Sequence, residues 1–309
     1  MPHIPRGFTP NAISLTTHAV AWVTAILALW SVYLAPFAKA MALIGAGIGM
    51  FISMIGDCVD GLHARRTNQT SKLGELMDHW LDAIIVPLVT VGITSALQMP
   101  AWANVAVNIT AAMVYNAQLV LYHHTGKFVH PEPATGAEAQ FGVSLGYIAM
   151  AGFFYYVDRD QPWLDMAFSA LALAAFVVQL RCSYFYYPKL GRALGEHFWF
   201  VGLCGGFGAL YLMGALERHV FLFTVVFTSF RICGTYVLNT ITKAPFNGRD
   251  LGLLAFIVAI FAAHFALPDA MVGPASLPNA LAVAACVYAI ARNLIDLRRR
   301  FSLLKPKAG

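Results

Sequence analysis

Four aspartates stand in two pairs on either side of a short basic stretch of the chain. Asp57 pairs with Asp60 and Asp78 with Asp82, and the sequence on both flanks is strongly apolar. A spacing of three or four residues puts both members of a pair on one face of a helix. If the two helices form a hairpin, the faces can meet, and four carboxylates so close together repel one another unless a cation lies between them. The pattern therefore predicts a site for a divalent cation.

Carboxylate oxygens without a nearby set of His or Cys residues suit a hard cation such as Mg²⁺, Mn²⁺ or Ca²⁺. Four carboxylates exceed what one Mg²⁺ usually takes and favour a two-metal site, an arrangement that supports phosphoryl transfer. Gly61, Ala64 and Gly74 are small, so a ligand can approach the helix backbone there. Arg65 is placed to contact a phosphate. The competing interpretation is a solvated hairpin in which the aspartates pair with the basic residues of the loop.

The composition indicates a membrane protein. Hydrophobic residues make up 59% of the 309 residues and charged residues 11%, less than half of the charged share that is usual in soluble domains. Ten apolar segments follow one another, and most reach the length of about 20 residues that crosses a bilayer core. They cover about 12–35, 38–62, 74–98, 102–123, 141–157, 163–186, 198–216, 219–241, 250–267 and 277–297. We expect an all-α, polytopic membrane protein with about ten transmembrane helices and an N-terminal interfacial helix within residues 1–11.

The distribution of basic residues predicts the orientation. With ten spans, both termini share a side with four loops that hold most of the Lys and Arg residues, near 63–73, 124–140, 187–197 and 242–249. Such loops face the cytoplasm, so we expect the aspartates at the cytoplasmic face. The net charge of +5 comes from these basic loops. It does not indicate binding of nucleic acid, because the basic residues are not interleaved with aromatic residues.

The order D-x-x-D-G-x-x-A-R-x8-G-x-x-x-D-x-x-x-D, from Asp57 to Asp82, resembles the signature of the CDP-alcohol phosphotransferase family and agrees with it at every fixed position. Within the family, A-R-R-T-N-Q-T-S-K-L-G-E-L-M-D-H-W-L-D looks like the choline and ethanolamine phosphotransferase branch. The resemblance is sharp from about Asn11 to Asp82. It implies one membrane domain over residues 1–309, which we divide into a catalytic core at about 12–190 and additional spans at about 198–297.

The resemblance also implies the reaction. A CDP-alcohol binds with its diphosphate across two Mg²⁺ ions, for which Mn²⁺ can substitute, and the hydroxyl of a lipid acceptor attacks the β-phosphorus and releases CMP. We assign the metal to Asp57, Asp60, Asp78 and Asp82 and donor binding to Asn11, Gly61, Ala64, Arg65 and Gly74. The expected reaction moves phosphoethanolamine or phosphocholine to diacylglycerol in phospholipid synthesis. The resemblance further implies a homodimer in the lipid bilayer.

Two departures from the branch affect the mechanism. The branch has a His just before a Thr-Lys pair, where this chain has Asn239 and Thr240, and that His acts with a Glu as a base dyad. The corresponding Glu is Glu138. Because the His is missing, Asp82 is the first candidate for the general base, with Glu138 and His79 as alternatives. Trp80 replaces a Gly of the branch and affects the substrate pocket.

Two other functions compete. Phosphatidyl transfer from CDP-diacylglycerol to a soluble alcohol would need a further basic pocket, and the candidates Arg181, Arg231 and Lys243 are scattered in sequence. A membrane transporter would show two halves with matching broken helices, which we do not find. The chain is shorter than most eukaryotic members of the branch, which indicates a bacterial or archaeal protein, and we expect a bacterial inner membrane.

Two residues outside the motif carry separate expectations. Arg231 lies in the middle of an apolar segment, where a cation is costly. We expect it to pair with a phosphate or with a structural carboxylate. His63 lies beside the basic loop and is expected at the surface.

Overall fold

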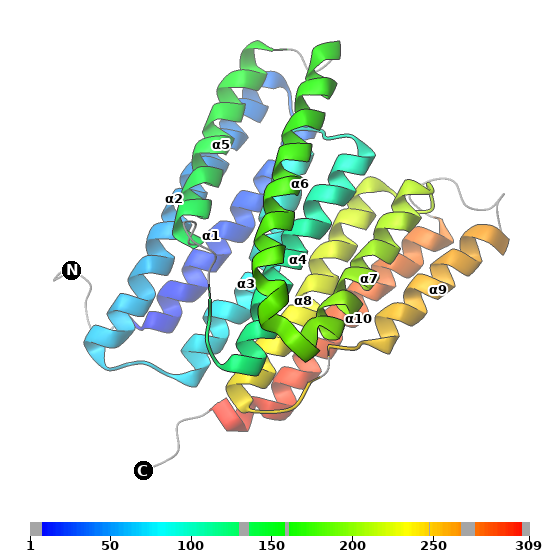
Figure 1. Ribbon diagram of the computed structural model, residues 1–309. Coiled ribbons are helices and arrows are strands. Elements are labelled where there is room, and N and C mark those ends of the chain that lie inside the picture. The colour runs from blue at the N-terminus through cyan, green and yellow to red at the C-terminus, as the bar shows by residue number, and fades with distance from the viewer. Residues whose placement is uncertain (1–7, 130–135, 158–160, 247, 267–275, 305–309) are drawn as a thin grey trace. The chain divides into compact units, whose positions relative to one another are not determined.

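A computed structural model describes residues 8–129, 136–157, 161–246, 248–266 and 276–304. Over these residues the chain is helical and contains no strand, as the composition predicts. Ten α-helices follow in chain order (Figure 1). They are α1 (Pro10–Trp30), α2 (Pro36–Thr67), α3 (Lys72–Ala96), α4 (Ala101–Thr125), α5 (Gly136–Tyr156), α6 (Pro162–Leu190), α7 (Leu194–Leu212), α8 (Arg218–Thr242), α9 (Leu251–Ala266) and α10 (Leu277–Arg300).

Each predicted apolar segment falls on one of these helices. Among the described residues, seven helical stretches are long and apolar enough to cross a membrane, including one that runs through α6 and α7 from Trp163 to Leu212, while α9 is shorter. The multi-helix membrane protein is therefore confirmed, and the count of about ten crossings stays a prediction. The expected interfacial helix falls largely on residues 1–7, which lie outside the described residues.

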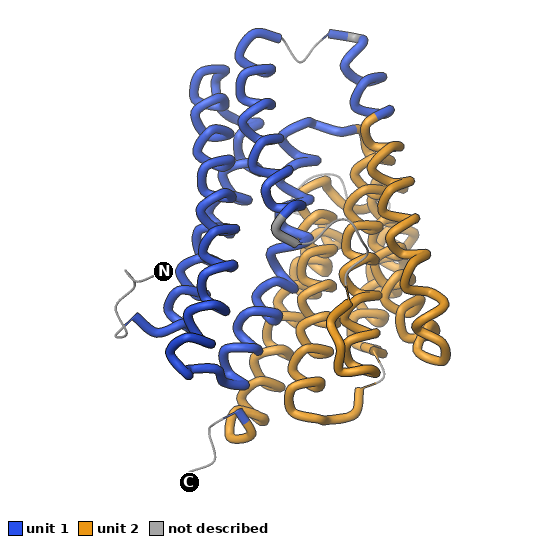
Figure 2. The backbone as a smooth tube through the Cα atoms, turned by 60° about the vertical axis from the view of Figure 1, so that its left-hand side comes forward, with its two compact units in different colours: residues 1–99, 130–170, 304–309 blue, residues 100–129, 171–303 orange. Residues whose placement is uncertain are grey.

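The chain divides into two compact units (Figure 2). Unit 1 comprises residues 1–99, 130–170 and 304–309, and unit 2 comprises residues 100–129 and 171–303. Unit 1 contains α1, α2, α3, α5 and the start of α6, and unit 2 contains the other helices. The four motif aspartates all belong to unit 1. The single domain over residues 1–309 with a catalytic core at about 12–190 stays a prediction.

Large apolar side chains are exposed on the helices of unit 1, including Val23, Trp30, Phe37 and Ile52. Soluble proteins seldom expose so many apolar side chains over neighbouring helices. Lipid tails would cover such a surface, in agreement with the hydropathy of the same helices.

Close packing of α1 on α2 depends on two glycines. Gly49 and Gly56 are seven residues apart and share a helix face, and a Cβ atom on either would collide with a threonine of α1, Thr24 and Thr17 respectively. The Thr17 hydroxyl also donates a hydrogen bond to the Ile13 carbonyl at 2.7 Å, which holds the side chain in place. The two helix backbones can therefore approach only because these positions lack a side chain.

A buried arginine network ties together three helices of unit 2. Arg231 on α8 donates from Nε to Asp250 Oδ2 at 2.7 Å and from Nη1 to Asp296 Oδ2 at 2.9 Å. Asp250 also caps the start of α9, since its Oδ1 accepts a hydrogen bond from the Leu253 amide at 3.1 Å. Of the two partners expected for Arg231, the structure shows the structural carboxylate.

We expect Gly56→Ala to lower the stability of unit 1, because the added methyl group must displace the β-branched Thr17. Overpacking of this kind costs about 1–3 kcal/mol, measured as a fall in the unfolding temperature of the purified protein in detergent. Gly45→Ala is the matched control, since Gly45 is on the same helix, is exposed and has open space at its Cβ position. Equal unfolding temperatures for the two variants would contradict the packing argument.

We expect Arg231→Gln to destabilise unit 2 strongly, because it leaves two largely buried carboxylates without their cation. Breaking a buried ion pair from one side costs about 3–5 kcal/mol, again measured by thermal unfolding in detergent. Arg298→Gln on the same unit removes an exposed arginine at the end of α10 and should change the unfolding temperature little. The network is not structural if both variants unfold like the parent protein.

Candidate functional site

A short turn connects the two helices that carry the aspartates. Asn68 takes the left-handed conformation after the end of α2, with φ of 55°, and its amide donates to the Ala64 carbonyl. Asparagine tolerates this conformation better than most residues. The Ser71 side chain then accepts a hydrogen bond from the Gly74 amide at 3.0 Å and caps α3. This local chemistry ends one helix and begins the next within four residues.

Helix α1 completes the site, because it packs against both α2 and α3. The sequence predicts a metal site made by two helices, whereas the structure brings in a third. Ser14 of α1 is buried and its hydroxyl donates a hydrogen bond to Asp60. His18, one turn further along α1, reaches α3, where its Nε2 lies 3.3 Å from Asp82 Oδ1.

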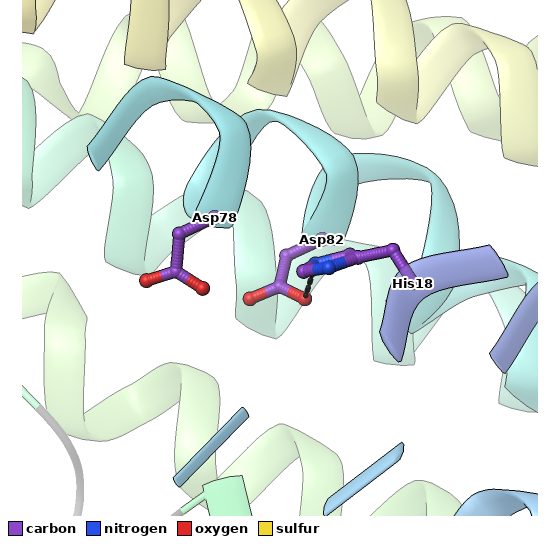
Figure 3. Close-up of side chains that lie close together, drawn as sticks. All are labelled: His18, Asp78 and Asp82. Carbon is purple, nitrogen blue, oxygen red and sulfur yellow. Dashed lines mark ion pairs between the residues drawn. The ribbon is translucent and has the colours of Figure 1, made fainter. Parts of the chain in front are cut away.

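The motif aspartates form two overlapping donor groups. In the first, one carboxylate oxygen from each of Asp57, Asp60 and Asp78 lies within 4.8 Å of the others. In the second, one ligand atom from each of His18, Asp78 and Asp82 meets the same limit (Figure 3). Asp78 is common to both groups. The structure thus brings together all four aspartates to which the sequence analysis assigns the metal.

The solvated-hairpin interpretation does not describe this arrangement. Over the described residues, none of the four aspartates forms an ion pair with a lysine or arginine. Asp60 is only 6% exposed, and the side chains of Asp78 and Asp82 are 36% and 28% exposed. The carboxylates therefore turn toward one another and not toward the basic loop, as they would around a cation.

A cavity of about 450 Å³ adjoins the first donor group. Its walls come from the start of α1, the end of α2, the turn and the start of α3. It is lined by Pro10, Asn11, Ser14, Asp60, Gly61, Ala64, Arg65, Gln69, Thr70, Ser71, Lys72, Gly74, Glu75 and Asp78. All five residues predicted to bind the donor are among them, and their assignment to donor binding stays a prediction.

The two glycines of the cavity have different surroundings. A Cβ atom on Gly74 would lie 3.0 Å from Asn11 Oδ1 and 3.3 Å from Ser71 Oγ, so this glycine makes room for neighbouring side chains. At Gly61 the nearest atom is Arg65 Nη1 at 3.4 Å. At Gly61 the guanidinium group of Arg65 therefore lies within contact distance of the Cβ position, and the expected approach of a ligand to the backbone stays a prediction.

The three candidates for the general base lie in different places. Asp82 belongs to the second donor group. His79 Nδ1 lies 3.8 Å from Asp78 Oδ2, too far for a hydrogen bond. Glu138 is exposed in the first turn of α5. Within the described residues, Glu138 neither lines the cavity nor belongs to a donor group. The places of these three side chains do not by themselves identify the general base.

His18 and Ser14 are site residues that the sequence did not predict, and the predicted position of His63 differs from the observed one. His63 is buried, with its Nε2 2.8 Å from the Phe8 carbonyl oxygen, so the expected surface position is wrong. The four-residue spacing of Ser14 and His18 in the first apolar segment is the one signal that could have found them, since it puts two polar side chains on one face.

In unit 2, the segment that departs from the branch forms the end of α8. Thr240, at one of the two places where the branch has a histidine, lies with its Oγ1 3.0 Å from Nδ1 of His123. Asn239 is buried, and neither polar atom of its side chain has a hydrogen-bond partner within the described residues. Although residue 240 is not a histidine in this chain, the histidine His123 of α4 lies beside it.

Comparison with known proteins supports the family resemblance that the motif indicates. The chain is 34% identical to cholinephosphotransferase 1 of Homo sapiens over 201 residues, which is 63% of this chain and 49% of that protein. It is 34% identical to cholinephosphotransferase 1 of Gallus gallus over 126 residues, 38% of this chain and 37% of that protein. These matches support the choline and ethanolamine branch, although they span about half or less of the relatives' length.

The family match is broader than the motif. Residues 8–180 match the CDP-alcohol phosphatidyltransferase family, a range that includes the three helices of the donor groups and the whole cavity lining. Because this range is more than half of the chain, the protein belongs to the CDP-alcohol phosphatidyltransferase family.

Proposed function

We propose that the protein is an integral-membrane phosphotransferase of phospholipid synthesis. It transfers the phospho-alcohol group of a CDP-alcohol to a lipid hydroxyl, with diacylglycerol as the acceptor, and releases CMP. The observation that carries the proposal is that the motif aspartates gather in two donor groups beside a cavity of about 450 Å³. The related proteins are cholinephosphotransferases, so phosphocholine is the first head group to test and phosphoethanolamine the second.

The cavity suits the nucleoside diphosphate part of the donor. Arg65 and Lys72 bring two cations to its wall, and a guanidinium group can bind two phosphate oxygens at once. Gly61 and Ala64 let the diphosphate approach the backbone of α2. Glu75 supplies a hydrogen-bond acceptor for the nucleoside on the opposite side, at the start of α3.

The two donor groups fit divalent cations. Asp57, Asp60 and Asp78 offer oxygens alone, which suits Mg²⁺. We propose two Mg²⁺ ions, for which Mn²⁺ can substitute, with Asp78 shared between them. When bound, such ions neutralise the charge of the diphosphate and of the leaving CMP.

The reaction needs a base for the acceptor hydroxyl. As the hydroxyl oxygen bonds to the β-phosphorus, the bond from that phosphorus to CMP breaks, and the hydroxyl proton passes to the base. Asp82 is our first candidate because it belongs to a donor group and is partly exposed. His79 and Glu138 remain the alternatives.

The membrane side and assembly are also proposals. We propose that the donor groups face the cytoplasm, and the excess of Lys and Arg in one set of loops supports this orientation. The related proteins come from animals and yeast, so they do not support the expected bacterial inner membrane. The homodimer rests on the family resemblance alone.

Phosphatidyl transfer from CDP-diacylglycerol to a soluble alcohol is the alternative reaction. A phosphorylated acceptor would need basic side chains beyond the motif, and Arg231 is one of three candidates for them. That guanidinium is already held by Asp250 and Asp296. The structure thus weakens the phosphatidyl-transfer alternative.

The other alternative, a membrane transporter, is tested by measuring the flux of CDP-choline into vesicles that contain the protein.

We expect Asp82→Asn to lower the rate of CMP release from CDP-choline and diacylglycerol by at least about 100-fold, the usual contribution of a general base. Glu138→Gln should lower it only a few-fold, because Glu138 lies outside the donor groups. The assay uses the full chain in lipid nanodiscs, with CDP-ethanolamine and CDP-diacylglycerol as separate donors. The assignment fails if Asp82→Asn binds Mg²⁺ normally and keeps most of its turnover. Product from CDP-diacylglycerol alone would favour the alternative reaction.

Because Asp78 belongs to both donor groups, we expect Asp78→Asn to weaken both cation sites and Asp57→Asn to weaken only one. Titration with Mn²⁺, followed by the electron paramagnetic resonance of the free ion, counts the ions bound per chain. The expected result is two tight sites in the parent protein, one in Asp57→Asn and none in Asp78→Asn. Equal counts in the two variants would show that the groups do not share a ligand.

A further inference from the structure

We propose that His18 is a cation ligand through its Nε2 atom, and that the second donor group therefore prefers a first-row transition-metal ion such as Mn²⁺ over Mg²⁺. This inference deepens the proposed function, on which it rests. It concerns a residue outside the motif, and it makes the two cation sites chemically different.

The position of His18 calls for a polar role. The residue is 3% exposed and lies on the inward face of α1, where it is the only titratable side chain of the helix. Burying an imidazole has a free-energy cost unless both ring nitrogens find partners. Figure 3 shows the ring beside Asp82, with Asp78 one helical turn earlier on α3. The imidazole therefore points at the carboxylates and not into the surrounding apolar packing.

The hydrogen bond at the far side of the ring fixes its tautomer. His18 Nδ1 lies 2.7 Å from the carbonyl oxygen of Ser14. A carbonyl oxygen only accepts hydrogen bonds, so Nδ1 must carry the proton. In the neutral ring, Nε2 then presents a lone pair toward Asp82 Oδ1 at 3.3 Å. In that form both atoms are hydrogen-bond acceptors, and a cation placed between them could bind both.

This arrangement is the one that metal-binding histidines usually adopt. Such a histidine binds the ion with one nitrogen and donates from the other to a carbonyl or carboxylate, which holds the ring in place. The Ser14 carbonyl has that role here. Since the Ser14 hydroxyl donates to Asp60, one residue of α1 contacts both donor groups.

The separations agree with one ion. At ligand distances of about 2.1 Å, opposite donors of an octahedral ion are about 4.2 Å apart. The ligand atoms of His18, Asp78 and Asp82 lie within 4.8 Å of one another, so a small adjustment closes them on a single ion. Asp78 and Asp82 are partly exposed, which leaves one side of the ion open for water or substrate.

The donor types differ between the groups. Asp57, Asp60 and Asp78 offer oxygens alone, the set that suits Mg²⁺. His18 adds an imidazole nitrogen to the second group, and imidazole suits transition-metal ions better than Mg²⁺. When both ions are present, we therefore expect Mn²⁺ to bind at the His18–Asp78–Asp82 group and Mg²⁺ at the Asp57–Asp60–Asp78 group.

The test uses the full chain in detergent, loaded with Mn²⁺ alone. Electron spin echo envelope modulation detects ¹⁴N that is bonded directly to Mn²⁺, and we expect this signal in the parent protein. It should disappear in His18→Gln, and the ratio of Mn²⁺ to Mg²⁺ affinity should fall by at least about tenfold. His63→Gln is the matched control, because His63 is also buried in unit 1 and bonded to a backbone carbonyl but belongs to neither donor group. This variant should keep the signal.

Two results would overturn the inference. One is the lack of nitrogen modulation in the parent protein at saturating Mn²⁺, which would make His18 a protonated partner of Asp82. The other is modulation that persists in His18→Gln and disappears in His79→Gln. If His18→Gln does not fold, His18→Asn replaces it. CMP release is measured on the same preparation, so nitrogen modulation without CMP release would reject the proposed function and leave the His18 ligand standing.

Discussion

Repulsion among four carboxylates is the physical constraint on which unit 1 depends. Asp60 is buried and the other three motif aspartates are partly buried. At an effective dielectric constant of 20, two unit charges 4.8 Å apart repel by about 3–4 kcal/mol. The Ser14 hydroxyl, which donates a hydrogen bond to Asp60, offsets only part of this repulsion. Bound cations would offset the rest, and this electrostatic need is the physical basis of the proposed metal site.

The precision of the site comes from packing that lies away from it. Gly49 and Gly56 let α1 approach α2, and this approach sets the register at which Ser14 meets Asp60. The same register brings His18 to α3. A change of a few tenths of an ångström between the helices would alter both contacts together, because they come from one face of one helix. The glycines of α2 thus determine which side chains complete the donor groups.

The sequence was sufficient for the parts of the site that are encoded locally. Three- and four-residue spacings place each aspartate pair on one face, and Asn68 and Ser71 end and begin the helices by local hydrogen bonds. His18 and His63 were missed or misplaced for the opposite reason. Their partners are far away in the chain, and only the docking of the N-terminal segment against α2 and α3 decides what they contact. The number of membrane crossings, too, depends on more than helix length.

Unit 2 shows the other way in which a membrane protein can hold carboxylates in an apolar interior. There Asp250 and Asp296 both bind the guanidinium group of Arg231, which also donates hydrogen bonds to Thr235 and Asn293. Each of the two carboxylates thus has a cationic partner from within the chain, and the network joins three helices. In unit 1, by contrast, no lysine or arginine pairs with the four aspartates over the described residues. The two clusters therefore differ in whether a basic side chain of the chain itself pairs with the carboxylates, and this difference is why we propose a cation site in unit 1 and a structural network in unit 2.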